Sequence, residues 1–142
     1  PVILVDRRYA GLDTHFVGID DEAAGVLATE HLIERGCRRI AHITGPERNT
    51  VLGRRAGYRR ALERHGLGFR AELMVVAGEV DDEGEQAGFG AMRALLSLDP
   101  QPDGVFCHND PTALGAMQAI LERGRRVPED IAVIGCGNLH YN

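Results

Sequence analysis

A chain of 142 residues is long enough to bury one hydrophobic core without disulfides or metal ions, and it fits a single domain. Its hydrophobic fraction of 44% and charged fraction of 26% are ordinary for a globular protein, and no apolar run approaches the length of a membrane span. The formal net charge of −5 argues against nucleic-acid binding by this chain, because contacts with phosphates need a basic surface.

Short apolar runs alternate with longer helical patterns along the chain. The apolar runs predict strands at 2–5, 40–44, 73–77, 104–108 and 131–134. Helices are predicted from Asp20 or Asp21 to about Arg35, from about Gly53 to His65, across the apolar positions 87–98, and from Asp110 to about Gly124. Continuous apolar strands separated by helices indicate an α/β fold, a doubly wound parallel sheet with helices on both faces.

Individual residues set the ends and faces of these helices. Gly36 and Gly66 are expected to end the first two, and Asp110 is expected to cap the last, since Pro111 follows it. In the first helix, the apolar positions that follow the helical period are Ala24, Leu27, Ala28, His31 and Leu32.

Polar groups and glycines collect where the predicted strands end. They are Asp6, Thr44 with Gly45, Gly78, the run from His108 to Asp110, and Gly137 with Asn138. In an open parallel sheet the carboxyl ends of the strands are where ligands are held. Asp6 can accept hydrogen bonds from a small polar ligand, and Asn109 can both donate and accept. Turn formation explains each of these residues about as well when it is taken alone.

The usual signatures of an enzyme are missing from the sequence. There is no G-x-G-x-x-G after a strand, no phosphate-binding G-x-x-x-x-G-K-[ST] loop and no G-x-S-x-G elbow. Cys107 and His108 are adjacent in a predicted strand, so their side chains point to opposite faces and cannot form a thiol–base pair. We therefore expect no catalytic site and no cofactor.

Cysteines and histidines also lack the spacing of a metal site or a disulfide framework. The three cysteines, Cys37, Cys107 and Cys136, lie far apart and form an odd set, which favours reduced, buried thiols. The six histidines show no i, i+4 pairing around a carboxylate motif. No metal is expected.

Two basic clusters occur, at 54–65 and at 123–127. The second lies in a predicted turn, where solvation explains it. In the first, Arg54 stands at the predicted start of a helix, just after the loop that follows a strand. A guanidinium in that position would present a rigid fork of donors toward the carboxyl edge of the sheet.

Five segments together resemble the effector-binding core of the lactose-repressor (LacI/GalR) family of bacterial transcription regulators. They are P-V-I-L-V-D-R at 1–7, the run from D-D-E-A-A-G to A-H-I-T-G at 20–45, R-R-A-G-Y-R-R-A-L at 54–62, P-D-G-V-F-C-H-N-D-P-T-A-L-G-A-M at 102–117 and G-R-R-V-P-E-D-I-A-V-I-G at 124–135. Their order and spacing cover nearly the whole chain. The family core has two α/β lobes with a small effector between them, as in periplasmic sugar-binding proteins, and a helix-turn-helix headpiece precedes it.

The resemblance implies a domain organisation. Residues 1–16 would hold the last strand of the first lobe and the crossover, and residues 17–142 the second effector-binding lobe, incomplete at its C-terminus. The DNA-binding headpiece would lie outside this chain. Residues 1–16 would then lack the sheet they belong to, and we expect them to be poorly ordered or to pair with a neighbouring chain.

The resemblance also implies site residues, one by one. The effector-binding positions are Asp6, Thr50, Arg54, Asn109 and Gly137. Two positions depart from the family pattern: Val80 stands where many members carry an aromatic residue, and Gly137 stands where most carry an acid that binds a sugar. Both departures weaken the expectation that the effector is a sugar.

The implied function is an effector-sensing module of a cytoplasmic transcription repressor, with DNA bound only through the missing headpiece. Its partners would be a sugar or similar polar metabolite and a second copy of the chain, contacted through Leu114 and Gln118 and, less surely, Met117. No membrane partner is expected. A periplasmic solute-binding protein of the same fold is the alternative, and an enzyme on the same sheet is a third reading that no residue pattern supports.

Overall fold

The structure is a computed structural model that describes residues 3–5, 15–17, 20–47, 49–77 and 84–136. The strands are β1 (Ile3–Val5), β2 (His15–Val17), β3 (Ile40–Thr44), β4 (Met74–Val76), β5 (Gly104–Cys107) and β6 (Ala132–Gly135). The helices are α1 (Asp21–Glu34), α2 (Asn49–Arg64), α3 (Gly84–Leu96) and α4 (Asp110–Glu122), with a 3₁₀ turn at Ala71–Leu73 before β4.

The main sheet has four parallel strands in the order β4-β3-β5-β6. The chain leaves β3 toward β4 on one side, crosses back to β5, and continues to β6 on the other side. This reversal between β3 and β5 makes the sheet doubly wound, as the alternation of strands and helices predicted.

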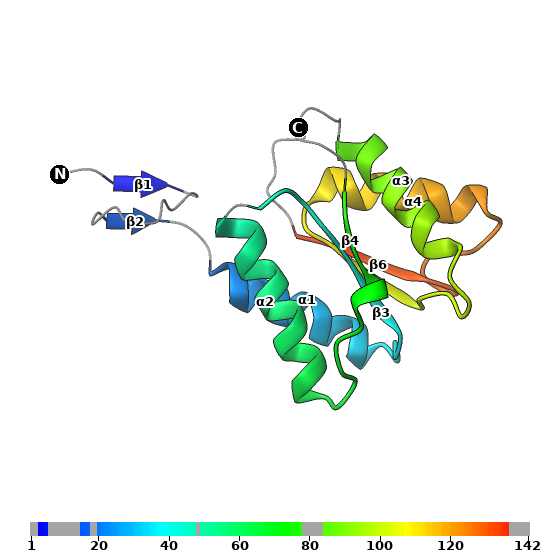
Figure 1. Cartoon of the computed structure of the whole chain (residues 1–142), viewed down its shortest axis with the longest axis horizontal. Helices are drawn as coiled ribbons and strands as arrows, with labels where there is room; N and C mark the ends of the chain where they lie inside the picture. The colour runs from blue at the N-terminus through cyan, green and yellow to red at the C-terminus, as the bar shows by residue number, and fades with distance from the viewer. Residues whose placement is uncertain (1–2, 6–14, 18–19, 48, 78–83, 137–142) are drawn as a thin grey trace.

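Helices cover both faces of this sheet (Figure 1). Ile40 and Phe106 belong to the hydrophobic cluster that packs under α1 and α2, and Ile43 and Val105 belong to the cluster under α3 and α4. Because neighbouring strand residues point to opposite faces, every residue of β3 is buried. That explains why the strand sequences read as continuous apolar runs.

One polar side chain lies fully inside the cluster under α1 and α2. The ring of His42 stacks on Phe106, with 4.6 Å between centroids, and lies 5.0 Å from the ring of Tyr58. Its Nδ1 lies 2.8 Å from the carbonyl oxygen of Phe106, which can only accept, so Nδ1 carries the proton. Burial lowers the pKa of His42 to about 3, and the ring is therefore neutral at physiological pH.

Glycines allow the two helices of each layer to touch through their backbones. A Cβ at Gly57 of α2 would lie 2.2 Å from the carbonyl oxygen of Glu22 in α1, and a Cβ at Gly115 of α4 would lie 1.9 Å from the carbonyl oxygen of Glu85 in α3. Gly25 and Gly88 make matching contacts from the opposite helices. Any larger residue at these positions would force the helices apart.

Most predicted elements are confirmed within a residue or two. The strands near 40–44, 73–77, 104–108 and 131–134 form the sheet, and the first helix begins after Asp20, whose side chain accepts a hydrogen bond from the Ala23 backbone at 3.0 Å. Gly36 and Gly66 follow the ends of α1 and α2 with φ of 99° and 72°. At these left-handed positions glycine is the residue that fits without strain.

Two predictions about where helices begin are wrong in detail. Helix α2 begins at Asn49 rather than Gly53. Asn109 caps α4, because its Oδ1 accepts a hydrogen bond from the Thr112 backbone, and Asp110 is the first helical residue. Leu27 follows the apolar period of α1 but is 68% exposed, because the buried face of this helix is formed by Gly25, Ala28, Thr29, Leu32 and Ile33.

The N-terminal segment contains a pairing that the sequence did not suggest. Strand β1 pairs in parallel with β2, with Ile3 opposite His15 and Val5 opposite Val17. The sequence predicts that residues 1–16 are poorly ordered or pair with a neighbouring chain; residues 3–5 pair instead with residues 15–17 of their own chain. Residues 6–14 and 137–142 lie outside the described residues.

No helix among the described residues is long and apolar enough to cross a membrane. The three cysteines are free, and Cys37 and Cys107 are buried whereas Cys136 is half-buried.

Replacing a glycine at a helix contact should be much more harmful than replacing one on an open surface. We expect Gly57→Ala to lower the free energy of unfolding by roughly 2 kcal/mol or more, because the new methyl group meets a backbone carbonyl that cannot move alone. Gly90→Ala in α3 should raise it by about 0.5–1 kcal/mol, since nothing lies within 4 Å and alanine favours the helix. Urea denaturation of both variants measures this; equal effects would contradict the backbone contact.

Candidate functional site

The topological reversal between β3 and β5 places two loops side by side at the carboxyl edge of the sheet. Thr44 and Gly45 end β3, and His108 and Asn109 follow β5. The two strands are neighbours, with Ile43 opposite Cys107, and the His108 backbone donates to the Ile43 carbonyl oxygen at 3.0 Å. In open α/β sheets this reversal is the position at which ligands bind.

The ring of His108 lies directly over Gly45. A Cβ at Gly45 would come within 2.6 Å of Cε1 of His108, so the ring occupies the space that any side chain at residue 45 would take. Nε2 of His108 lies 3.3 Å from the hydroxyl oxygen of Thr112 in α4. A glycine at the end of β3 therefore lets an imidazole lie across the reversal point.

Asn109 lies at the reversal point and performs two tasks. Its Oδ1 accepts from the Thr112 backbone at 3.0 Å and so caps α4. Its Nδ2 donates no hydrogen bond to the part of the chain that the structure describes. The amide is half-buried, so this donor can serve a ligand without disturbing the cap.

Arg54 joins three elements at the same edge. It is only 5% exposed, and its Nε donates to Oδ1 of Asp21 at 3.2 Å, at the start of α1. Its Nη1 donates to the backbone carbonyl of His108, directly after β5. Arg54 thus links α2, α1 and β5 while it lies near the mouth of the sheet. A buried guanidinium with a buried partner holds its geometry far better than an exposed one.

Arg55 is a residue of this edge that sequence reasoning did not single out. Its Nη2 lies 3.4 Å from the hydroxyl of Thr44, and its Nη1 lies 3.8 Å from Oε1 of Glu47. Its Nε is buried and has no hydrogen-bond partner among the described residues. The pair of arginines was visible in the sequence, but only the packing of α2 shows that both side chains reach the edge of the sheet.

The remaining predicted effector-binding residues are placed unevenly. Thr50 is half-buried in the first turn of α2, one turn before Arg54, so the two share one helix face. Asp6 and Gly137 lie outside the described residues, as does Val80. Their roles in effector binding stay predictions.

The predicted dimer contact lies on the outer face of α4. Leu114 is 49% exposed, Gln118 is exposed one turn later, and Leu121 is exposed after a further turn, while Met117 is half-buried. Leu114, Gln118 and Leu121 form a short, mostly apolar stripe that no described residue covers. We call these three residues the α4 stripe.

A nucleophilic thiol at this edge is disfavoured by its surroundings. Cys107 is fully buried, and burial raises the pKa of its thiol well above the usual range, so it stays protonated. The adjacent His108 ring lies against Gly45 and Thr112 instead. The arrangement suits the binding of a polar molecule rather than covalent chemistry.

Known proteins are similar to this chain in sequence and in fold. The family described as "Periplasmic binding protein-like domain" matches residues 29–141. The HTH-type transcriptional repressor PurR of Salmonella paratyphi B is 39% identical over 141 residues, which make up 98% of this chain and 40% of that protein. The same repressor of Salmonella newport matches equally well. The chain therefore spans less than half the length of the curated relatives that it matches.

Solved structures of transcriptional regulators are also similar to this chain in fold. A sugar-binding transcriptional regulator of the LacI family from Escherichia coli, complexed with phosphate, superposes with a TM-score of 0.83 and 32% identity over 95% of this chain and 48% of that chain. The transcriptional regulator CelR, in complex with cellobiose, gives a TM-score of 0.84 and 37% identity over 95% of this chain and 41% of that chain. A LacI transcriptional regulator from a Rhodococcus species gives 0.81 and 37%, over 95% and 48% of the two chains.

Among the ion pairs that join α2 to α1, Arg54–Asp21 and Arg60–Glu22 differ most in burial, and this difference predicts very different contributions to stability. The side chains of Arg54 and Asp21 are 6% and 12% exposed, whereas those of Arg60 and Glu22 are 60% and 45% exposed. Arg54→Lys should lower the free energy of unfolding by roughly 1–3 kcal/mol, because one ammonium group cannot reach both the Asp21 carboxylate and the His108 carbonyl. Arg60→Lys should change it by less than about 0.5 kcal/mol. Thermal or urea unfolding compares the two; a similar small loss from both would contradict the role of Arg54.

Proposed function

The chain belongs to the periplasmic binding protein-like domain family and is an effector-binding domain of the LacI-regulator type, and on that basis we propose that it senses a small polar metabolite for a DNA-binding repressor. The observation that carries the proposal is the set of polar side chains at the reversal point of the sheet. His108 and Asn109 follow β5, and Arg54 reaches the same point from α2. This is where a doubly wound sheet holds a ligand.

The proposed effector contacts are Asp6, Thr50, Arg54, Asn109 and the backbone at Gly137. Thr50, Arg54 and Asn109 supply hydroxyl, guanidinium and amide groups, which suit hydroxyl or carboxylate oxygens of a ligand. The similar CelR structure is a complex with cellobiose, which supports a sugar as the effector. Gly137 and Val80 provide neither a carboxylate nor a ring, so a polar metabolite other than a sugar fits the same edge.

DNA binding belongs to the proposal for the complete protein and not to this chain alone. The PurR relatives are transcriptional repressors of the helix-turn-helix type, and this chain corresponds to 40% of their length. We propose that residues 17–142 form the second lobe, residues 1–16 the link to a first lobe, and a separate headpiece binds DNA in the cytoplasm. Ligand binding would shift the balance between two lobe arrangements, and the headpiece would respond to that shift. The matches to regulators disfavour a periplasmic transport role, and relatives that are repressors disfavour an enzyme.

A homodimer completes the proposal. The α4 stripe of Leu114, Gln118 and Leu121 offers apolar area in a form that a two-fold axis can bury on both subunits at once. Its place on α4, whose first residues follow Asn109, would join the dimer contact to the effector site through a single helix.

Effector binding can be tested without disturbing the fold by replacing Asn109 with aspartate. A thermal-shift screen of sugars, nucleobases and small acids against the complete regulator should first identify a stabilising ligand. Asn109→Asp keeps the Oδ1 acceptor that caps α4 but replaces the Nδ2 donor with a second acceptor. We expect the melting temperature without ligand to change little and the affinity to fall about tenfold or more, because a donor becomes a repelling oxygen.

The isolated chain should bind the same ligand much more weakly than the complete regulator, since one lobe supplies one wall of the site. Calorimetry measures both affinities. Unchanged affinity in Asn109→Asp, or tight binding by the isolated chain, would contradict the proposed site.

The dimer is tested by placing a charge on the α4 stripe. We expect Leu114→Glu to convert the protein to a monomer in sedimentation equilibrium, because two carboxylates would face each other across the axis. Leu27→Glu is the matched control, since Leu27 is 68% exposed on the other layer of helices. If both variants keep the association state of the parent protein, the contact lies elsewhere.

A further inference from the structure

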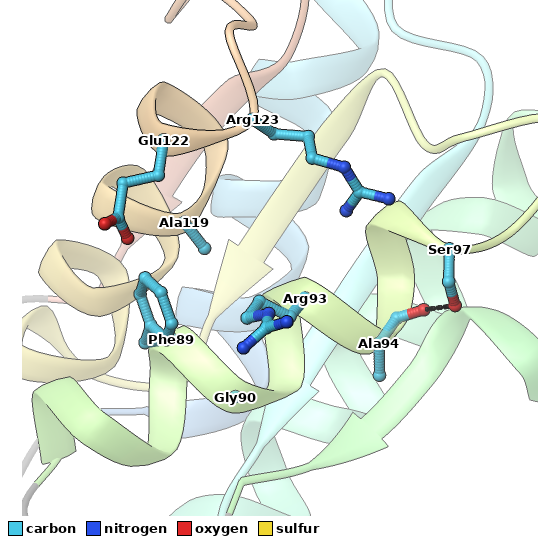
Figure 2. A pocket seen from close by; sticks show the side chains of 8 residues that line it. All are labelled: Phe89, Gly90, Arg93, Ala94, Ser97, Ala119, Glu122 and Arg123. Carbon is cyan, nitrogen blue, oxygen red and sulfur yellow. Dashed lines mark hydrogen bonds between the residues drawn. The ribbon is translucent and has the colours of Figure 1, made fainter.

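A second concave site lies between the C-terminal halves of α3 and α4 (Figure 2). Its volume is about 670 Å³, within the range of small-molecule sites. Since both helices run back from the carboxyl edge of the sheet, their C-terminal ends lie at the opposite edge from the effector site. The groove is lined by Phe89, Gly90, Arg93, Ala94, Ser97, Ala119, Glu122 and Arg123.

The backbone contacts between the two helices lie at the other end of the pair. Gly84 of α3 touches Pro111, and Gly88 touches the Thr112 backbone, so the N-terminal halves are in van der Waals contact. Gly90, in contrast, has nothing within 4 Å of the place where its Cβ would be. Absence of a side chain at residue 90 therefore leaves this stretch of the groove open.

Two guanidinium groups border the groove and lack an anionic partner. Neither Arg93 nor Arg123 forms an ion pair within the part of the chain that the structure describes. Both stand at the C-terminal turns of their helices, where the carbonyl dipoles favour a cation. That interaction stabilises the charge but leaves the N–H donors of each fork available.

The rest of the lining is apolar except for the hydroxyl of Ser97 and the carboxylate of Glu122. Arg93 lies over the ring of Phe89, with 5.9 Å from its Cζ to the ring centroid, and the buried Ala119 closes the groove on the α4 side. Ser97 donates its hydroxyl to the Ala94 carbonyl at 2.6 Å and keeps its lone pairs. Figure 2 shows the Arg123 side chain extending toward Ser97, away from Glu122. Negative charge on a ligand is therefore favoured at the Arg93 and Arg123 end and disfavoured beside Glu122.

We propose that this groove is a second ligand site, which binds a small organic anion: a phosphate or carboxylate carried on an aromatic or apolar body. The anionic group pairs with Arg93 and Arg123, and the apolar body packs against Phe89 and Ala119 in the space that Gly90 leaves open. None of the effector-binding residues lines the groove, and the α4 stripe borders it, because Glu122 of the groove lies one turn after Gln118 of the stripe.

Phenyl phosphate is a suitable probe, with inorganic phosphate as its counterpart without the apolar body. We expect calorimetry to show saturable binding of phenyl phosphate to the purified protein with Kd of about 1 mM or tighter, and binding of inorganic phosphate at least about fivefold weaker. Amide shifts in ¹H–¹⁵N spectra should centre on Gly90, Ala94 and Ser97. Equal affinity for the two probes, or no saturable binding, would overturn the proposal.

Three variants separate a built site from general electrostatics. Arg93→Gln and Arg123→Gln should each weaken phenyl phosphate binding by about fivefold or more. Arg125→Gln removes the same charge two residues from Arg123 but outside the groove, and it should change the affinity by less than about twofold.

Gly90→Leu should abolish binding by filling the groove, with both arginines intact. An equal loss from Arg125→Gln, full binding by Gly90→Leu, or shifts centred on Thr50 and His108 would each contradict the site, the last by assigning the probe to the effector edge.

Discussion

Direct contact between helix backbones determines how this domain is put together. Gly57 lies against the Glu22 carbonyl on one face of the sheet, and Gly115 lies against the Glu85 carbonyl on the other. Each contact holds the first turn of one helix against the middle of its neighbour. Close packing at these points then leaves little freedom for the loops that follow β3 and β5, and those loops carry the candidate effector site.

Arg54 connects this packing to the chemistry of the site. Its guanidinium satisfies the Asp21 carboxylate at the start of α1 and the carbonyl of His108 after β5, so one buried side chain ties the helix layer to the loop beside the ligand position. A ligand that recruited donors of Arg54 would alter contacts with both elements. That coupling offers a physical route by which binding could change the arrangement of α1 and α2, in keeping with the proposed sensory role.

The helix pair α3 and α4 is closely packed at one end and leaves a groove at the other. At the carboxyl edge, small residues bring the helices together and Asn109 caps α4 beside the effector site. At the opposite edge, the same two helices leave a groove lined by the ring of Phe89 and by Arg93 and Arg123, which form no ion pair with the residues that the structure describes. The α4 stripe borders the groove, since Gln118 and Glu122 are one turn apart, whereas the proposed effector contact at Asn109 lies at the other end of α4.

Sequence by itself determined the parallel sheet, the order of its helices and the neighbourhood of the site, because burial on both faces forces continuous apolar strands and strand ends meet at one edge. It also marked Gly36 and Gly66, where local backbone geometry demands glycine. Only the tertiary structure decided that Asn109 rather than Asp110 caps α4, that Leu27 faces outward and that Arg55 reaches Thr44. Those outcomes depend on how far each helix is rotated and where its first turn begins. Contacts between helices determine both the rotation of each helix and the position of its first turn. Glycine makes the closest of these contacts, and because it has no side chain, no apolar pattern in the sequence reveals where they are.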